Sequence, residues 1–265
     1  MDIKILVAAH KEYRIPEDPI YIPIHVGHAL VKQDFGWLGD DTGDNISIKN
    51  PNYCELTALY WAWKNLDADA IGLVHYRRHF LSQNMDKIKK IKFLINLCND
   101  ELKWNSILSK QEVEKILVKY PVIVPKKRHY YIETVESQYV HAHHKQDIEI
   151  VRKILENKQK QYFEAFNEHM NKRSTHICNM FIMKKIFFNE YCSWLFDLLF
   201  DVEKNIDISN YLKNDARIFG FLGERLLDVW LNVNKINYYE NNIVLLEKQQ
   251  VIKKCSLFLL RKLFK

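Results

Sequence analysis

The sequence predicts an α/β protein built on a mainly parallel sheet, and three observations support this fold class. Short apolar runs such as Ile3–Ala9 and Ala70–His75 are continuous rather than alternating, as in strands buried on both faces of a sheet. Longer amphipathic segments separate these runs, as expected for helices that connect parallel strands. Five of the 7 glycines precede residue 73, so we expect the tight turns in the first third of the chain.

The expected elements follow from these patterns in chain order. Residues 36–52 are rich in Gly, Asp and Asn and predict a loop. Asn52, with Glu55 three residues later, has the spacing of a capping box and predicts a helix start. Residues 133–171 predict two helices. The other expected strands are Pro121–Pro125 and His176–Lys184, and the other expected helices are Tyr53–Asn65, Ile186–Glu203 and Arg217–Val233.

Composition excludes several classes of protein. The net charge of +6 is too small to indicate a nucleic-acid-binding protein, although it suits a small anionic ligand. The 5 cysteines contain no C-x-x-C pair, which favours reduced thiols in the cytoplasm. No apolar run reaches the roughly 18 residues of a membrane span. The motifs of dinucleotide-binding, P-loop, serine hydrolase and zinc protease sites are also missing.

The C-terminal end differs from the rest of the chain. We expect one domain over residues 1–240 and a basic amphipathic tail over residues 241–265. Within the tail, Lys254, Arg261 and Lys265 fall on one helical face, and leucines fill much of the remainder. Such a helix can lie on the anionic inner surface of the cell membrane. Docking on the protein core is the alternative.

Basic residues follow the predicted strands. Because ligands bind beyond the carboxyl ends of strands in open α/β sheets, these residues are the first candidates for a binding site. They are His10 and Lys11, then His75, Tyr76, Arg77, Arg78 and His79, then Lys126, Lys127 and Arg128, and finally Lys184 and Lys185. Adjacent Arg77 and Arg78 indicate a diphosphate, which guanidinium groups bind bidentately. An internal ion pair with the acidic loop is the alternative.

That acidic loop, Gly39–Asn45, holds Asp40, Asp41, Asp44 and Asn45. Its oxygens suit Mg²⁺ or Mn²⁺, or the hydroxyls of a sugar or ribose. A polar turn stabilised by its own side chains is the alternative.

Histidines His141, His143 and His144 lie within four residues, with Asp147 beyond them. They could bind zinc, but they are better suited to hydrogen-bonding a sugar or phosphate, and a polar helix face is the alternative.

Arg217, Gly220 and Glu224 fall along one face of a predicted helix. A glycine inside a helix costs roughly 1 kcal/mol and indicates close approach of a ligand or backbone. Glu224 in a cleft could be a general base, whereas solvated surface charges are the alternative.

Several of these blocks, in this order, resemble a bacterial family of capsule and O-antigen glycosyltransferases that was long catalogued as a domain of unknown function. Some of its members are assigned as galactofuranosyltransferases. The resemblance covers about residues 1–232. The matching blocks are Gly39–Asn50, Tyr53–Thr57, Tyr60–Asn65, Gly72–Phe80, Tyr139–Asp147, His176–Met183 and Arg217–Leu226.

The resemblance implies a GT-A-like Rossmann-type domain that binds a UDP-sugar. Many such domains carry an Asp-x-Asp metal motif after a central strand, where this sequence has His75-Tyr76-Arg77-Arg78. Metal dependence is therefore doubtful, and arginines could neutralise the leaving diphosphate instead.

The expected reaction is inverting transfer of a hexose, with galactofuranose as a candidate, to a lipid-linked glycan. Glu224 is the expected base, with Asp44 as second choice. The expected substrate-binding residues are His10, Asp40, Asp41, Asn45, His75, Tyr76, Arg77, Arg78, His143, His144, Asp147, Asn179 and Arg217. A non-catalytic glycan-binding or assembly protein of the same pathway is the alternative.

Overall fold

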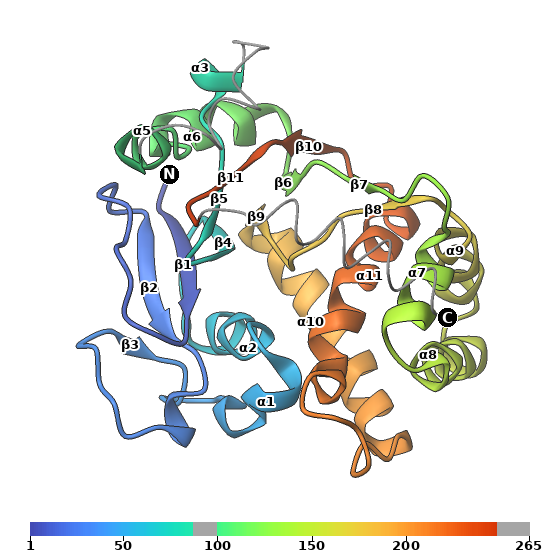
Figure 1. The fold of residues 1–265 in the computed structure, drawn as a ribbon. Helices are drawn as coiled ribbons and strands as arrows, with labels where there is room; N and C mark the ends of the chain where they lie inside the picture. Colours follow the sequence, from blue (N-terminus) through green and yellow to red (C-terminus); the bar gives the residue numbers. More distant parts are fainter. Residues whose placement is uncertain (87–99, 248–265) are drawn as a thin grey trace.

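A computed structural model describes residues 1–86 and 100–247 of the chain. Figure 1 shows one twisted sheet with helices on both of its faces. Its strands are β1 (Ile3–Ala9), β2 (Tyr21–His25), β3 (Leu38–Gly39), β4 (Ala70–His75), β5 (Arg78–Phe80), β6 (Val122–Pro125), β9 (Phe181–Lys184), β10 (Tyr238–Asn241) and β11 (Ile243–Leu245), and a separate pair is formed by β7 (Arg128–His129) and β8 (Ser174–Thr175).

The helices are of very different lengths. They are α1 (Asn50–Tyr53), α2 (Leu56–Asn65), α3 (Gln83–Asp86), α5 (Asp100–Asn105), α6 (Lys110–Lys119), α7 (Val135–Ala142), α8 (Lys145–Lys158), α9 (Lys160–Met170), α10 (Lys185–Asn205) and α11 (Ile218–Val233). Short 3₁₀ turns cover His28–Leu30, Ser47–Lys49 and Asp215–Arg217.

The sheet has the order β10-β6-β9-β4-β1-β2-β3, with β5 and β11 off this path. Strands β3, β2, β1 and β4 pair in parallel, as do β6 and β10, whereas β9 is antiparallel to both β4 and β6. The expected mainly parallel α/β architecture is therefore confirmed.

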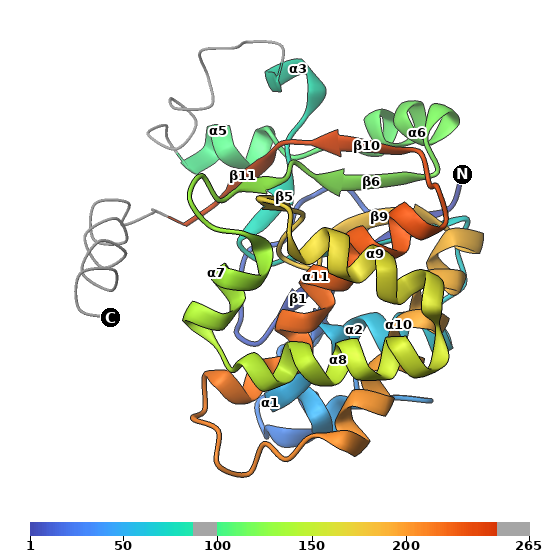
Figure 2. The ribbon, with the colours of Figure 1, turned by 90° about the vertical axis from the view of Figure 1, so that its right-hand side faces the viewer.

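Strand β1 shows why its sequence is continuously apolar. Leu6 and Ala8 join the hydrophobic core under α2, α10 and α11, while Ile5 and Val7 join the core under α6. Both faces of the strand are thus buried from Ile5 to Ala9, and its polar residue, Lys4, lies near the start, where its ammonium donates to the Asp67 carbonyl. Figure 2 shows α8 and α9 beside α11, against which α9 packs.

Two expected strands, β1 and β4, have the predicted limits, but the fourth one is shorter than predicted. β9 begins only at Phe181, because Cys178 and Asn179 have φ angles of 78° and 45°, which a strand cannot accommodate. Its antiparallel direction also corrects the placement of Lys184 and Lys185. Lys184 pairs with Ala70 at the start of β4, so both lysines lie at the sheet edge opposite to the predicted site.

Other local predictions need correction too. The helix expected over Tyr53–Asn65 is two helices, because Cys54 has a φ of 53° between them. Asn52 does not cap a helix, since its side-chain amide donates to the Ala216 carbonyl. Residues 133–171 form three helices instead of two.

Strand β2 was not expected because it contains Pro23. β3 pairs only with Ile24 and His25, so at Pro23 the strand is an edge strand, where the missing N–H has no cost.

The predicted domain boundary at residue 240 falls within β10, and β11 continues the sheet by pairing with β5. The predicted basic helix of residues 251–265 lies outside the described residues. Among the residues that the structure describes, no helix is long and apolar enough to cross a membrane.

Candidate functional site

The candidate site lies where the carboxyl ends of β1 and β4 meet the segment that leads into β9. His75, the last residue of β4, has its Nε2 atom 2.5 Å from the carbonyl oxygen of Cys178. The same ring nitrogen lies 3.7 Å from Glu55, which directly precedes α2. Antiparallel β9 therefore brings its amino end, residues 176–180, to the edge where the parallel strands end.

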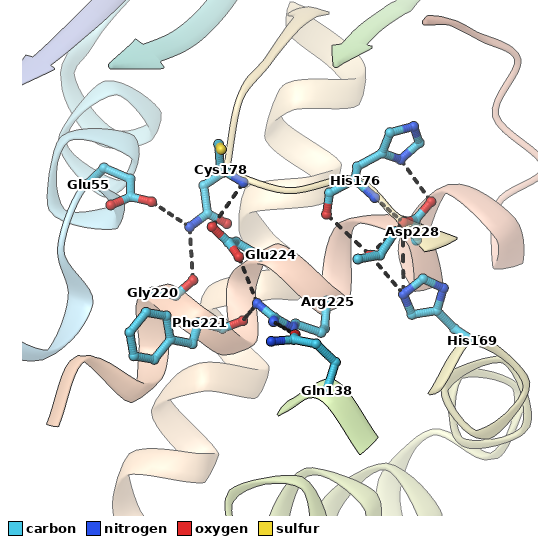
Figure 3. Close-up of polar contacts among 12 residues, drawn as sticks. Glu55, Gln138, His169, His176, Cys178, Gly220, Phe221, Glu224, Arg225 and Asp228 are labelled. Atoms are coloured by element: carbon cyan, nitrogen blue, oxygen red, sulfur yellow. Dashed lines mark hydrogen bonds and ion pairs between the residues drawn. The ribbon is translucent and has the colours of Figure 1, made fainter. Parts of the chain in front are cut away.

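A left-handed turn at Cys178 and Asn179 is the centre of this site. Two consecutive non-glycine residues with positive φ cost of order 1–3 kcal/mol each and require support from their surroundings. Glu224 of α11 accepts the Cys178 backbone N–H at 2.9 Å, and Glu55 accepts the Asn179 side-chain amide at 2.7 Å. Figure 3 shows both carboxylates reaching the turn, one from α2 and one from α11.

Two glycines of α11 allow this close approach. A Cβ atom on Gly223 would lie 2.9 Å from the Asn179 side-chain oxygen, and one on Gly220 would lie 3.2 Å from the Cys54 sulfur. The carbonyl of Gly220 also accepts the Asn179 amide at 2.9 Å. The structure therefore explains the sequence-based interpretation of Gly220 as a point of close approach: Cys54 and Asn179 of the same polypeptide pack closely against it.

The two carboxylates of the turn differ in how many partners they have. Both oxygens of Glu224 are engaged, Oε1 by Cys178 and Oε2 by Arg225 at 2.7 Å. Glu55 uses only Oε1, and its Oε2 has no hydrogen-bond partner among the described residues. The alternative of solvated surface charges at Glu224 and Arg225 does not hold, because their side chains are 22% and 5% exposed.

Guanidinium groups surround this turn from several elements. Arg217 donates its Nε–H to the Cys54 sulfur at 3.1 Å and is otherwise exposed.

The pKa of the Cys178 thiol is raised to about 12. Burial is the main cause, and the negative charge of Glu224 adds to it, while the positive charge of Arg78 opposes the rise. At neutral pH the thiol therefore carries no charge and is a poor nucleophile.

Arg77 and Arg78 do not form a single clamp. Arg77 pairs with Glu247 at 3.2 Å, so the alternative of a pair with the acidic loop does not apply. The guanidinium of Arg78, in contrast, has no hydrogen-bond or ion-pair partner in the described part of the chain. Burial, followed by the charges of Lys11, Arg77 and Arg217, lowers the pKa of His10. His10 is therefore near Arg77 and Arg217, and its ring contacts that of Tyr76 edge-on.

The acidic loop is occupied by its own contacts. Buried Asp40 accepts the backbone N–H groups of Gly27 and His28, and the Ser47 hydroxyl. Asp41 pairs with His28 at 2.9 Å, and Asn45 bonds to the loop backbone.

Asp44 is exposed and accepts the Tyr60 hydroxyl at 3.1 Å, while Asn65 binds its backbone. Asn65 ends α2 and Glu55 precedes it, so Asp44 lies near the opposite end of a helix of 10 residues. This is roughly 15 Å along the axis.

The histidine segment packs against α11 and against the residues that precede this helix. His143 stacks on Phe221 and His144 on Tyr211, while the nearest carboxylate to both rings is Asp215, at 3.5 and 3.8 Å. Burial, followed by the charge of Arg225, lowers the pKa of His143. Asp147 is buried and accepts the hydroxyls of Tyr139 and Tyr211, each at 2.7 Å. Asp147 therefore serves to stabilise the fold through these two hydroxyl groups.

No group of three His, Cys, Asp or Glu side chains is placed to hold a metal ion within residues 1–86 and 100–247. Asp40, Asp41 and Asp44 each turn toward a different partner, and His141 pairs with Glu133 at 2.6 Å. The residues present therefore do not fit the Mg²⁺, Mn²⁺ or Zn²⁺ sites that the sequence suggested as possibilities.

The structure thus brings together His10, His75, Tyr76, Arg77, Arg78, Asn179, Arg217 and Glu224, and leaves apart Asp40, Asp41, Asp44, Asn45, His144 and Asp147. His143 lies next to the first group, because its ring stacks on Phe221, which Arg217 also contacts. The sequence pattern predicts only a helix-capping role for Glu55. A signal was available, since Glu55 sits within a block of the family resemblance.

One helical turn beyond Glu224, Asp228 supports the same segment. It accepts the backbone N–H of His176 at 2.8 Å and the Thr175 hydroxyl at 3.0 Å, and it pairs with the His176 ring and with Lys127. Figure 3 shows this second carboxylate beside the first on α11. The two carboxylates of one helix therefore hold the chain from Thr175 to Cys178.

Comparison with known proteins agrees with this architecture. The family model described as "Domain of unknown function (DUF4422)" matches residues 4–235. A solved structure, "WbbM bifunctional glycosytransferase apo structure", superposes with a TM-score of 0.79 at 28% sequence identity. The match covers 92% of this chain but only 45% of that chain. The search of curated proteins found no match.

The similarity to a glycosyltransferase structure confirms the GT-A-like α/β fold that the resemblance implied. Since the family model spans most of the described residues, this chain belongs to the DUF4422 family.

Proposed function

We propose that this chain is a glycosyltransferase that moves a hexosyl group from a UDP-sugar to an acceptor hydroxyl. One observation carries the proposal. A carboxylate with a free oxygen, Glu55, lies at the ligand-binding edge of an α/β sheet where the unpaired guanidinium of Arg78 and the exposed one of Arg217 gather. Glycosyl transfer needs both parts, a base for the acceptor and positive charge for the diphosphate.

In the proposed inverting reaction, the acceptor oxygen attacks the anomeric carbon as the bond from that carbon to the diphosphate oxygen breaks. The acceptor proton passes to the carboxylate, and the electron pair of the broken bond leaves with UDP. Charge therefore develops on the diphosphate, and preorganised positive groups there lower the barrier. Arg78 and Arg217, with Arg77 beside them, would supply this stabilisation without a metal.

Among the carboxylates, Glu55 is better suited to be the base than Glu224. A base needs an oxygen that can accept a proton, and both oxygens of Glu224 already accept hydrogen bonds. We therefore assign to Glu224 the positioning of the Cys178–Asn179 turn, and through it of Glu55 and His75. Asp44 has no role in this scheme, because the structure places it at the other end of α2.

The identity of the substrates extends the proposal. The similarity to WbbM supports glycosyl transfer in general. From the family resemblance of the sequence alone, we extend the proposal to a donor such as UDP-galactofuranose and a lipid-linked acceptor in capsule or O-antigen synthesis. A lipid-linked acceptor would bring the protein to the inner face of the cell membrane, where a basic segment such as residues 251–265 would favour binding.

Titration of the full chain with UDP and with a panel of UDP-hexoses, with and without EDTA, tests the proposal. We expect UDP to bind and one donor to be turned over regardless of EDTA. Arg217→Ala should weaken UDP binding about 10–100-fold, since a hydrogen bond to a charged group contributes roughly 1.5–3 kcal/mol.

Two results would contradict this function. Binding of glycans with no turnover of any donor would indicate a non-catalytic glycan-binding protein. Unchanged UDP affinity in Arg217→Ala would remove the diphosphate from this edge of the sheet.

A further inference from the structure

A cavity lies beside Asp228, one of the two carboxylates that hold the segment from Thr175 to Cys178. It has a volume of about 370 Å³ and lies between the end of α9, the second half of α11 and the start of β10. This volume is within the range of small-molecule sites. None of the residues that line it belongs to the group around the Cys178–Asn179 turn, so it is a separate site.

The charges around this cavity are unbalanced. Lys127, Lys172 and Lys235 line it, and the carboxylate that lines it is Asp228. Asp228 is already paired with Lys127 at 3.0 Å and with the His176 ring at 2.8 Å. The side-chain ammonium groups of Lys172 and Lys235 have no hydrogen-bond or ion-pair partner in residues 1–86 and 100–247, and both residues are exposed. The cavity therefore keeps two uncompensated positive charges.

Its other walls suit a sugar ring. His169 and Asp228 are buried and form the floor, where both oxygens of Asp228 are already bonded. The ring of Tyr238, with the Lys127 ammonium 5.9 Å from its centre, gives an apolar surface of the kind that stacks on carbohydrate. Burial lowers the pKa of His169 to about 4, so this ring is neutral at physiological pH and adds no charge.

We infer that this cavity binds a phosphorylated monosaccharide, with the phosphate between Lys172 and Lys235 and the sugar over Tyr238. A phosphate monoester carries a charge of about −1.5 to −2 at neutral pH, which matches the two free lysines better than the single charge of a carboxylate. This site does not depend on the proposed transfer reaction. Its floor is Asp228, which also holds the backbone of His176, so a ligand there would contact the support of the Cys178–Asn179 turn.

Isothermal titration of the full chain with glucose 1-phosphate tests this inference. We expect binding that weakens at high salt, with at least a tenfold loss of affinity in the double variant Lys172→Glu/Lys235→Glu. The matched control Lys153→Glu/Lys160→Glu changes the same charge at two exposed lysines of α8 and α9, and should bind as the wild type does. Thermal unfolding would show that both variants fold, and Lys172→Ala/Lys235→Ala gives a milder second test.

Three outcomes would overturn the inference. These are no binding of glucose 1-phosphate to the wild type, equal binding by the Glu double variant, and tighter binding of glucose or glucuronate than of glucose 1-phosphate. Arg217→Ala separates the two proposals, since it should weaken UDP but leave glucose 1-phosphate unaffected. Loss of glucose 1-phosphate binding in Arg217→Ala alone would place that ligand at the UDP site and remove the second one.

Discussion

The Gly39–Asn45 loop and the Cys178–Asn179 turn both contain predicted substrate-binding residues, yet they use their polar groups in opposite ways. The carboxylates of the loop accept hydrogen bonds from adjacent turns, and the Asn45 amide donates to carbonyls of the loop itself. The turn is stabilised from outside by carboxylates of two different helices, and it leaves one oxygen of Glu55 unused. The number of acidic residues in a segment is therefore a poor indicator of a functional site. A carboxylate oxygen without a hydrogen-bond partner, beside guanidinium groups without ion-pair partners, is a better one.

The largest loss of stability is expected when Asp228, which holds the segment before the Cys178–Asn179 turn, is replaced. Asp228→Ala would leave Lys127 and the His176 ring without their shared counter-ion. Breaking a buried ion pair costs about 3–5 kcal/mol. Urea unfolding should show a loss of this size, and a change below about 1 kcal/mol would mean that the network does not hold the segment.

A smaller loss of stability is expected in the loop. Asp40→Ala removes an acceptor from two backbone N–H groups and the Ser47 hydroxyl. A buried donor left unpaired costs about 1–3 kcal/mol. UDP affinity should stay close to that of the wild type, because Asp40 is turned toward Gly27, His28 and Ser47 and away from the Cys178–Asn179 turn. A large loss of UDP affinity in a folded Asp40→Ala protein would show that the loop is part of the binding site after all.

Gly223→Ala should disturb the turn and leave the loop unchanged. The added methyl group would meet Asn179 at 2.9 Å and Leu56 at 3.1 Å, so the Asn179 side chain must shift, which disturbs its hydrogen bond with Glu55. Overpacking of this kind costs about 1–3 kcal/mol. The rate of transfer should fall by more than this stability loss explains at temperatures where the variant is folded. Gly220→Ala is the milder control, since its nearest contact is at 3.2 Å.

The smallest effect should be a pH dependence from His176. Burial alone would lower the pKa of its ring, but the hydrogen bonds with Asp228 and Glu240 outweigh it and raise that pKa above 6.5. A raised pKa gives stability that is present below pH 6.5 and is lost as pH rises through the folded-state value. The stability difference between wild type and His176→Gln should therefore be larger at pH 6 than at pH 9. An equal difference at both values would contradict a charged His176.

The sequence predicted the fold better than it predicted the site. Continuous apolar runs identify β1 and β4 because both of their faces are buried, and this pattern is local. The direction of β9 is not a local property, because it depends on pairing with β4 and β6. This antiparallel pairing places Lys184 and Lys185 at the sheet edge opposite to the one predicted.

The same limit applies to the proposed catalytic groups. Nothing near Glu55 in the sequence shows that Asn179, 124 residues away, will bind one of its oxygens and leave the other free. The positive φ of Cys178 could not be read from the sequence either, because it is imposed by Glu224 on α11.

The central claim is that transfer takes place beside the turn and not in the loop, and the transfer rates of Glu55→Gln and Asp44→Asn test it most directly. Both variants remove one charge and keep the shape of the side chain. A general base contributes about 10²–10⁴-fold, so Glu55→Gln should lower the rate by this amount while UDP affinity is retained, and Asp44→Asn should stay within about twofold of wild type. A wild-type rate in Glu55→Gln, or a loss confined to Asp44→Asn, would contradict the account.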